Sequence, residues 1–268
     1  AVQHNQCGMT THCCNESLPY CFIDLLNSVV MTDGRAAYVA QYIPGRVTVE
    51  LAGAGRVEIV QETDYPTSGK VRISLGPERE AAFSVFVRIP KWCKSPEVKM
   101  CGTPIRQVYA GGRYLRLTKT WRKGDAIDLD FPMEIRCVKG RARQSGRFAV
   151  MRGPMVYAFN PKAQLARPIV QLDGSRTLNK DAVALFNRHA FDIQHTMVVD
   201  PATLRMSKGP EGSSRPDGCA IEALASVVHP AVGSHQGARA WIRLSEFPDP
   251  DATVTYFRAP DIRRQLPG

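Results

Sequence analysis

The sequence contains no run of about 20 consecutive apolar residues, the length that a membrane-spanning helix needs. Its first residues, AVQHNQCG, lack an initiator methionine and the basic and apolar regions of a signal peptide. We therefore expect a globular chain with no membrane partner, and we expect its first residue to be a cut end. Localisation stays open between the bacterial cytoplasm and the periplasm.

Evenly spaced cysteines are also lacking, which argues against a disulfide-bonded scaffold. Four isolated cysteines are expected to pack as small apolar side chains without a function, namely Cys93, Cys101, Cys137 and Cys219. Cys13 and Cys14, by contrast, are neighbours. A disulfide between neighbours strains the backbone because the two Cβ atoms must converge. The adjacent pair therefore needs another explanation.

The formal net charge of +10 includes a basic cluster between Arg136 and Arg152. This cluster lacks the series of interleaved aromatic residues that stack on bases, and it matches no nucleic-acid-binding motif. Its charges alternate with apolar residues that are typical of a strand. We therefore interpret the cluster as a solvated sheet face and expect no nucleic-acid partner.

Long helices are scarce, and only residues 15–30 place apolar residues at helical spacing. Asn15 or Ser17 can cap this helix, and Pro19 fits its first turn. From Ala36 onward the apolar period changes to two, in short β-rich segments separated by turn residues. This pattern predicts a mainly β fold.

The short segments between residues 36 and 160 predict an antiparallel β-sandwich domain. Within it, the alternation in AAFSVFVRIP predicts one inward face formed by Phe83, Val85, Val87 and Ile89. Residues 161–268 predict a second β-rich domain, with a short helix over residues 181–190 and an exposed loop over residues 206–218.

Several motifs follow one another in a distinctive order: Cys-Cys, one helix, DGRAAYVAQYIP, QETDYP, FVRIPKW, VKMCGTP, GGRYLRLTKTWRKGDAIDLDFPMEIR and GRFAVMRGPMVYAFN. This set resembles the C-terminal half of the β-L-arabinofuranosidase family, glycoside hydrolase family 127, over roughly residues 11–160. In that family an (α/α)6 barrel carries the sugar pocket and β-sandwich domains follow it. The resemblance implies that residues 1–35 are the end of such a barrel.

The resemblance also implies a role for the cysteine pair, since the family binds zinc there. Cys13 would be the nucleophile and a zinc ligand, Cys14 a second zinc ligand, and His12 a residue that lines the sugar pocket. This chemistry is reasonable, because zinc accepts cysteine ligands and holds a coordinated thiol in its reactive thiolate form. Cysteine would replace the carboxylate nucleophile of most retaining glycosidases.

Two features depart from the family. The chain contains no Glu-x-Cys, the motif that completes the family's zinc site upstream, and the residues NESLP after the pair differ from the usual ones. The latter difference points to another pentose or a deoxy sugar. Since the acid/base glutamate also belongs to the barrel, we expect this chain alone to be inactive.

Three interpretations therefore compete. The first is part of a retaining, zinc- and cysteine-dependent glycoside hydrolase, with a carbohydrate substrate and an N-terminal barrel of the same parent chain as partners. It leaves open whether the complete protein forms a homodimer. The second is a non-catalytic carbohydrate-binding or structural module, and the third a simple metal or redox site at the cysteine pair.

Four other residues suggest sites less strongly. Glu62 and Asp64 form a carboxylate pair in QETDYP, for which we expect turn and interface roles. Trp92 and Trp121 have the size of sugar-stacking platforms, but each ends a strand pattern. We therefore expect both tryptophans to pack in the core.

Overall fold

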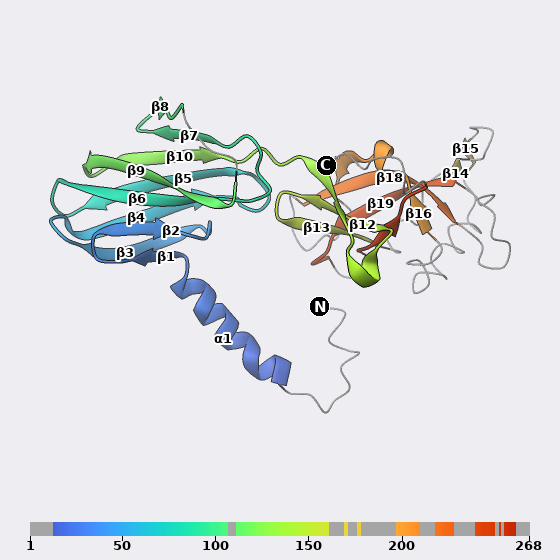
Figure 1. The fold of residues 1–268 in the computed structure, drawn as a ribbon, viewed down its shortest axis with the longest axis horizontal. Helices are drawn as coiled ribbons and strands as arrows, with labels where there is room; N and C mark the ends of the chain where they lie inside the picture. The colour runs from blue at the N-terminus through green and yellow to red at the C-terminus, as the bar shows by residue number, and fades with distance from the viewer. Residues whose placement is uncertain are drawn as a thin grey trace. The chain divides into compact units, whose positions relative to one another are not determined.

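The computed structural model describes residues 13–106, 111–160, 169–170, 176–177, 197–209, 218–227, 239–249, 252 and 255–260. These residues are mainly β, as the sequence predicts, and they divide into two compact units between Met133 and Glu134 (Figure 1). Among them, no helix is long and apolar enough to cross a membrane. Each unit is described by itself below.

The first unit begins with the helix α1, Cys13–Asn27, and continues as two sheets (Figure 1). The four-stranded sheet has the order β1 (Val30–Thr32), β2 (Ala36–Val39), β6 (Ala81–Ile89) and β9 (Arg113–Trp121). The six-stranded sheet has the order β3 (Gly45–Leu51), β4 (Gly55–Thr63), β5 (Lys70–Pro77), β10 (Asp125–Asp130), β7 (Glu97–Met100) and β8 (Thr103–Pro104). Strands β2 and β6 pair in parallel, and the other pairs in these two sheets are antiparallel.

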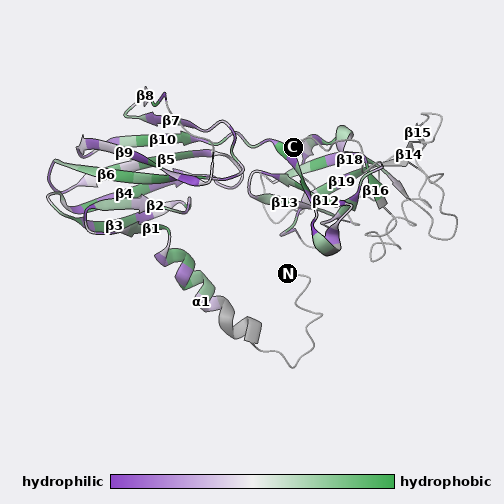
Figure 2. Cartoon of the chain, in the orientation of Figure 1, coloured by the Kyte–Doolittle hydropathy of each residue, from purple (hydrophilic) through white to green (hydrophobic). Residues whose placement is uncertain are grey.

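One apolar core joins the two sheets, because alternate residues of each strand face inward. Figure 2 shows this alternation as changes of colour along the strands. On β6 the predicted inward residues are all buried, with Val85 and Val87 fully covered and Phe83 and Ile89 nearly so. The sandwich and its inward face in β6 are therefore confirmed.

Gly69 lies where two backbone segments meet, since its carbonyl oxygen accepts a hydrogen bond of 3.1 Å from the Phe131 N–H. A Cβ atom added to Gly69 would overlap the Phe131 carbonyl group. A backbone group cannot rotate away as a side chain can, so the strands that carry it would have to shift.

We expect Gly69→Ala to lower the free energy of unfolding by about 1–3 kcal/mol, the usual cost of overpacking. Gly76→Ala is the matched control, because its added Cβ would make only an ordinary contact with Glu58. Urea unfolding of both variants checks this. Equal stability of the two variants would contradict the close approach at Gly69.

The described residues of the second unit form one ten-stranded sheet. Its strands are β11 (Ile135–Lys139), β12 (Arg147–Arg152), β13 (Met155–Phe159), β14 (Ile169–Val170), β15 (Arg176–Thr177), β16 (Met197–Val199), β17 (Arg205–Lys208), β18 (Cys219–Val227), β19 (Arg239–Glu246) and β20 (Phe257–Arg258). The described part of this unit also contains the short 3₁₀ helices η2 (Ala142–Gln144) and η4 (Pro201–Thr203). A core of its own contains Phe148, Tyr157, Ile221 and Leu244.

The structure corrects the domain boundary that we predicted near residue 160. Strand β12 pairs with β20 and β13 pairs with β19, so the strands between residues 135 and 159 belong to the second unit. Alternation identifies a strand from local sequence, whereas its partner is set by long-range pairing. The boundary after Met133 could therefore not be read from the strand pattern.

Three local predictions also differ from the structure or lie outside it. Helix α1 ends at Asn27 rather than Val30 and holds Pro19 inside it, because its helical residues extend back to Cys13. The first part of the loop predicted over residues 206–218 is strand β17, which pairs with β18. The helix predicted over residues 181–190 lies outside the described residues.

Candidate functional site

The cysteine pair occupies the first two described positions of α1. Successive residues of an α-helix point about 100° apart around its axis, since there are about 3.6 residues in each turn. Cys13 and Cys14 therefore both lie in the first described turn of α1. Their side chains, like the whole of His12, lie outside what the structure describes.

The later part of α1 carries large apolar side chains that are exposed. They are Tyr20, Phe22, Ile23, Leu25 and Leu26, with exposed fractions of 70%, 58%, 54%, 39% and 65%. Several neighbouring exposed apolar residues on one element typically mark a surface that another protein segment covers. The helix therefore presents an apolar surface close to the cysteine pair in sequence.

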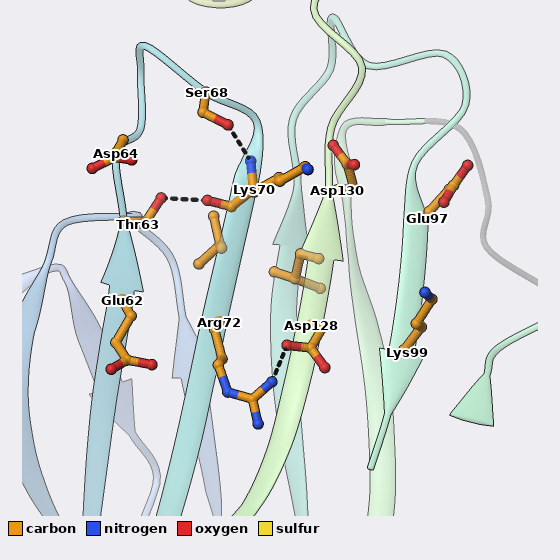
Figure 3. A pocket seen from close by; sticks show the side chains of 12 residues that line it. Glu62, Thr63, Asp64, Ser68, Lys70, Arg72, Glu97, Lys99, Asp128 and Asp130 are labelled. Atoms are coloured by element: carbon orange, nitrogen blue, oxygen red, sulfur yellow. Dashed lines mark hydrogen bonds and ion pairs between the residues drawn. The ribbon is translucent and has the colours of Figure 1, made fainter. Parts of the chain in front are cut away.

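A second candidate is an open trough of roughly 610 Å³ on the six-stranded sheet. Strands β4, β5, β10 and β7 and the turn after β4 form it (Figure 3). Its lining is mostly charged or polar: Glu62, Thr63, Asp64, Ser68, Lys70, Val71, Arg72, Glu97, Lys99, Asp128, Leu129 and Asp130. The trough thus lies on the face of the sheet opposite the apolar core.

Strand register arranges these charges in rows. Glu62 pairs with Arg72, Arg72 with Asp128, and Asp128 with Lys99. The charges along this row alternate in sign, and Arg72 Nη1 lies 2.6 Å from Asp128 Oδ1 (Figure 3). Alternating charges on directly opposite residues stabilise a sheet, by about 0.2–1 kcal/mol for each pair. The charges of this row are therefore explained by their pairing with one another, and they do not require a bound ligand.

The turn after β4 brings Asp64 to one end of the trough (Figure 3). The Asp64 carbonyl oxygen accepts hydrogen bonds from the N–H groups of Thr67 and Ser68, at 2.8 and 3.3 Å. The Thr63 hydroxyl donates to the Lys70 carbonyl oxygen at 2.6 Å. Asp64 therefore has the turn role that we predicted, whereas Glu62 belongs to the charged row.

The sequence pattern alone did not identify Arg72 and Asp128, the central residues of that row. Their outward orientation could have been read from the alternation in KVRISL and DAIDLD. Their pairing could not, because β5 and β10 are adjacent in the sheet and distant in the sequence.

Neither predicted core tryptophan lines the trough. Trp121 is fully buried, and its Nε1–H donates a hydrogen bond of 3.0 Å to the Phe83 carbonyl oxygen. Trp92 is half-buried and packs edge-on against Phe131, with 6.3 Å between ring centroids. Core packing is therefore confirmed for both.

Within the described ranges, no group of three or more His, Cys, Asp or Glu side chains is placed to hold a metal ion. The five acidic residues of the trough are spread along it and interleaved with basic ones (Figure 3).

Comparison with known sequences finds one family model that matches residues of the first unit. Residues 36–133 match the family model described as the β-L-arabinofuranosidase GH127 middle domain, and the match ends where the first unit ends. The chain resembles the C-terminal portion of GH127 β-L-arabinofuranosidases, as its motif order predicts. No curated protein matches the chain in sequence.

Three solved structures share the fold of most of the chain. A GH127 β-L-arabinofuranosidase from Geobacillus stearothermophilus T6 aligns with a TM-score of 0.65 and 21% identity, over 92% of this chain and 37% of that one. A glycoside hydrolase aligns with a TM-score of 0.67 and 19% identity, over 94% of this chain and 40% of that one. A GH127 β-arabinofuranosidase aligns with a TM-score of 0.62 and 17% identity, over 86% of this chain and 36% of that one. This chain therefore spans about two fifths of their length.

Proposed function

We propose that this chain is the C-terminal portion of a retaining glycoside hydrolase that removes terminal arabinofuranosyl or related sugar residues. The observation that carries this proposal is the match of residues 36–133 to the GH127 middle domain. The likeness to solved structures supports it by extending the shared fold to the second unit. In this proposal the two β units support a catalytic barrel that lies upstream in the complete protein.

The donor chemistry of the cysteine pair fits a zinc ion, because thiolates are preferred ligands of Zn²⁺. Cys13 and Cys14 would supply two ligands of a tetrahedral site, and the upstream barrel would supply the others. When bound, zinc supplies positive charge that favours the thiolate form of its cysteine ligands.

In this proposal Cys13 is the nucleophile of the double displacement. Its sulfur forms a bond to the anomeric carbon as the glycosidic bond breaks, and water later displaces the sulfur to give retention. The acid/base group comes from the barrel, and His12 lines the sugar pocket. The exposed apolar side chains of α1 support a partner there, since a barrel helix packed on them would cover the surface.

The alternative is a carbohydrate-binding or structural module. Sugar-binding clefts commonly place aromatic rings against the apolar faces of sugars. The twelve residues that line the trough include no aromatic residue, and its central charges pair with one another. The trough therefore favours a structural role for the sandwich over a sugar-binding one.

We expect the purified chain alone to show no hydrolysis of an aryl β-L-arabinofuranoside above that of its Cys13→Ala variant. The physical reason is that a retaining mechanism needs an acid/base group opposite the nucleophile, and the proposal assigns that group to the barrel. Release of the aryl alcohol measures this, with the complete protein as positive control. Turnover by the chain well above that of the variant would contradict the assignment of the acid/base group to the barrel.

A further inference from the structure

Cys101, for which the sequence predicted no function, lies among charged groups at the edge of the sandwich. It occupies the turn between β7 and β8 and is exposed. Its Sγ accepts a hydrogen bond from the Lys119 Nζ at 3.1 Å, and its thiol donates to the Asp125 Oδ1 at 3.2 Å. Lys119 belongs to β9 of the four-stranded sheet, whereas Asp125 belongs to β10 of the six-stranded sheet.

The two charged partners hold each other in place. Lys119 Nζ lies 2.8 Å from Asp125 Oδ2, and the same oxygen accepts a hydrogen bond of 2.9 Å from the Arg122 N–H. The hydrogen bond that Lys119 donates to Asp125, followed by the one that it donates to Cys101, raises the pKa of Lys119. The hydrogen bond from Lys119 lowers the pKa of Asp125. Both groups are therefore charged at neutral pH, and an ammonium group is held against the sulfur.

Other described cysteines have different surroundings. Cys93 is buried, so reagents in solution cannot reach it. Cys137 is half-buried, and burial raises its pKa to about 11, which keeps it a thiol near neutrality. Cys21 is exposed on α1 and so provides a reference for accessibility alone. Cys101 combines exposure with an ammonium contact, the combination typical of reactive cysteines.

We propose that Cys101 is a peroxide-reactive thiol that is oxidised to a sulfenic acid, with Lys119 as the group that promotes its reaction. The Cys101 thiolate attacks one oxygen of hydrogen peroxide, so an S–O bond forms as the O–O bond breaks. The leaving hydroxide takes up a proton and becomes water. Sulfur is oxidised by two electrons to the sulfenic acid, and peroxide is reduced. Lys119 stabilises the anionic sulfur of the thiolate before this step, whereas the Asp125 carboxylate opposes its negative charge.

The test measures the rate of sulfenic acid formation at each cysteine of the full chain. The chain is treated with hydrogen peroxide at neutral pH, trapped with dimedone and analysed by peptide mass spectrometry, and iodoacetamide alkylation is measured in parallel. Cys21 is the internal reference, and Cys101→Ser confirms the assignment of the peptide. Cys101 should react faster than Cys21 in both assays.

Two variants separate charge from accessibility, because Lys119→Met and Asp125→Asn both break the same ion pair. We expect the first to slow the reaction of Cys101 and the second to accelerate it, each by about five-fold, as for unit charges near contact in water. If loss of the ion pair instead loosened the sheet edge around Cys101, the reaction rate of Cys101 would change in the same direction in both variants. A common direction, no change in either variant, or a wild-type Cys101 no faster than Cys21 would each overturn the proposal.

Discussion

Cys13→Ser in the complete protein is expected to lower kcat/KM by more than about 1,000-fold, the scale of losses seen when a catalytic nucleophile is removed. A serine hydroxyl is almost fully protonated near neutrality and is a poorer nucleophile and leaving group than a thiolate. Hydrolysis of an aryl β-L-arabinofuranoside measures the effect. Near-normal activity of this variant would return the pair to a structural or redox role.

Cys14→Ser is the matched control, because it changes the neighbouring residue by the same single atom. We expect it to act through the metal: zinc content should fall, activity should fall with it, and added zinc should restore part of both. Metal analysis beside kinetics distinguishes the two variants. If both lost activity at full zinc occupancy, Cys14 would have a role beyond that of a ligand.

The sequence predicted the sandwich well because the signal for it is local. The alternation in β6 assigns Phe83, Val85, Val87 and Ile89 to one face, and all four are buried. The sheet that a strand joins is not a local property. Residues 147–159 have the same alternation as the strands before them, yet β12 and β13 pair with strands near the end of the chain.

The candidate sites show the same division between local and long-range information. Cys13 and Cys14 are noticed because they are adjacent in the sequence, and their proposed roles come from the resemblance. The charged row of the trough and the cluster at Cys101 depend on strand register. Arg72 meets Asp128, and Cys101 meets Lys119, across strands whose pairing no local pattern specifies.

Trp121 is the largest fully buried side chain among the described residues, and it lies in the core between the two sheets of the first unit. Its ring packs against Phe83, with 6.1 Å between ring centroids, and its Nε1–H donates to the Phe83 carbonyl oxygen. Truncation would leave a large cavity between the sheets and remove the donor to that carbonyl. Both effects reduce stability, and relaxation of the surrounding strands recovers only part of the loss.

We expect Trp121→Ala to lower the free energy of unfolding of the first unit by about 3–5 kcal/mol. Tyr114→Ala is the control on the same strand, where the ring is 41% exposed, and it should cost less than about 1.5 kcal/mol. Urea unfolding followed by hydrogen exchange of peptides from β6 and from β18 reports on each unit separately. Equal losses in the two variants, or a loss in β18 as large as in β6, would contradict a core of its own for the first unit.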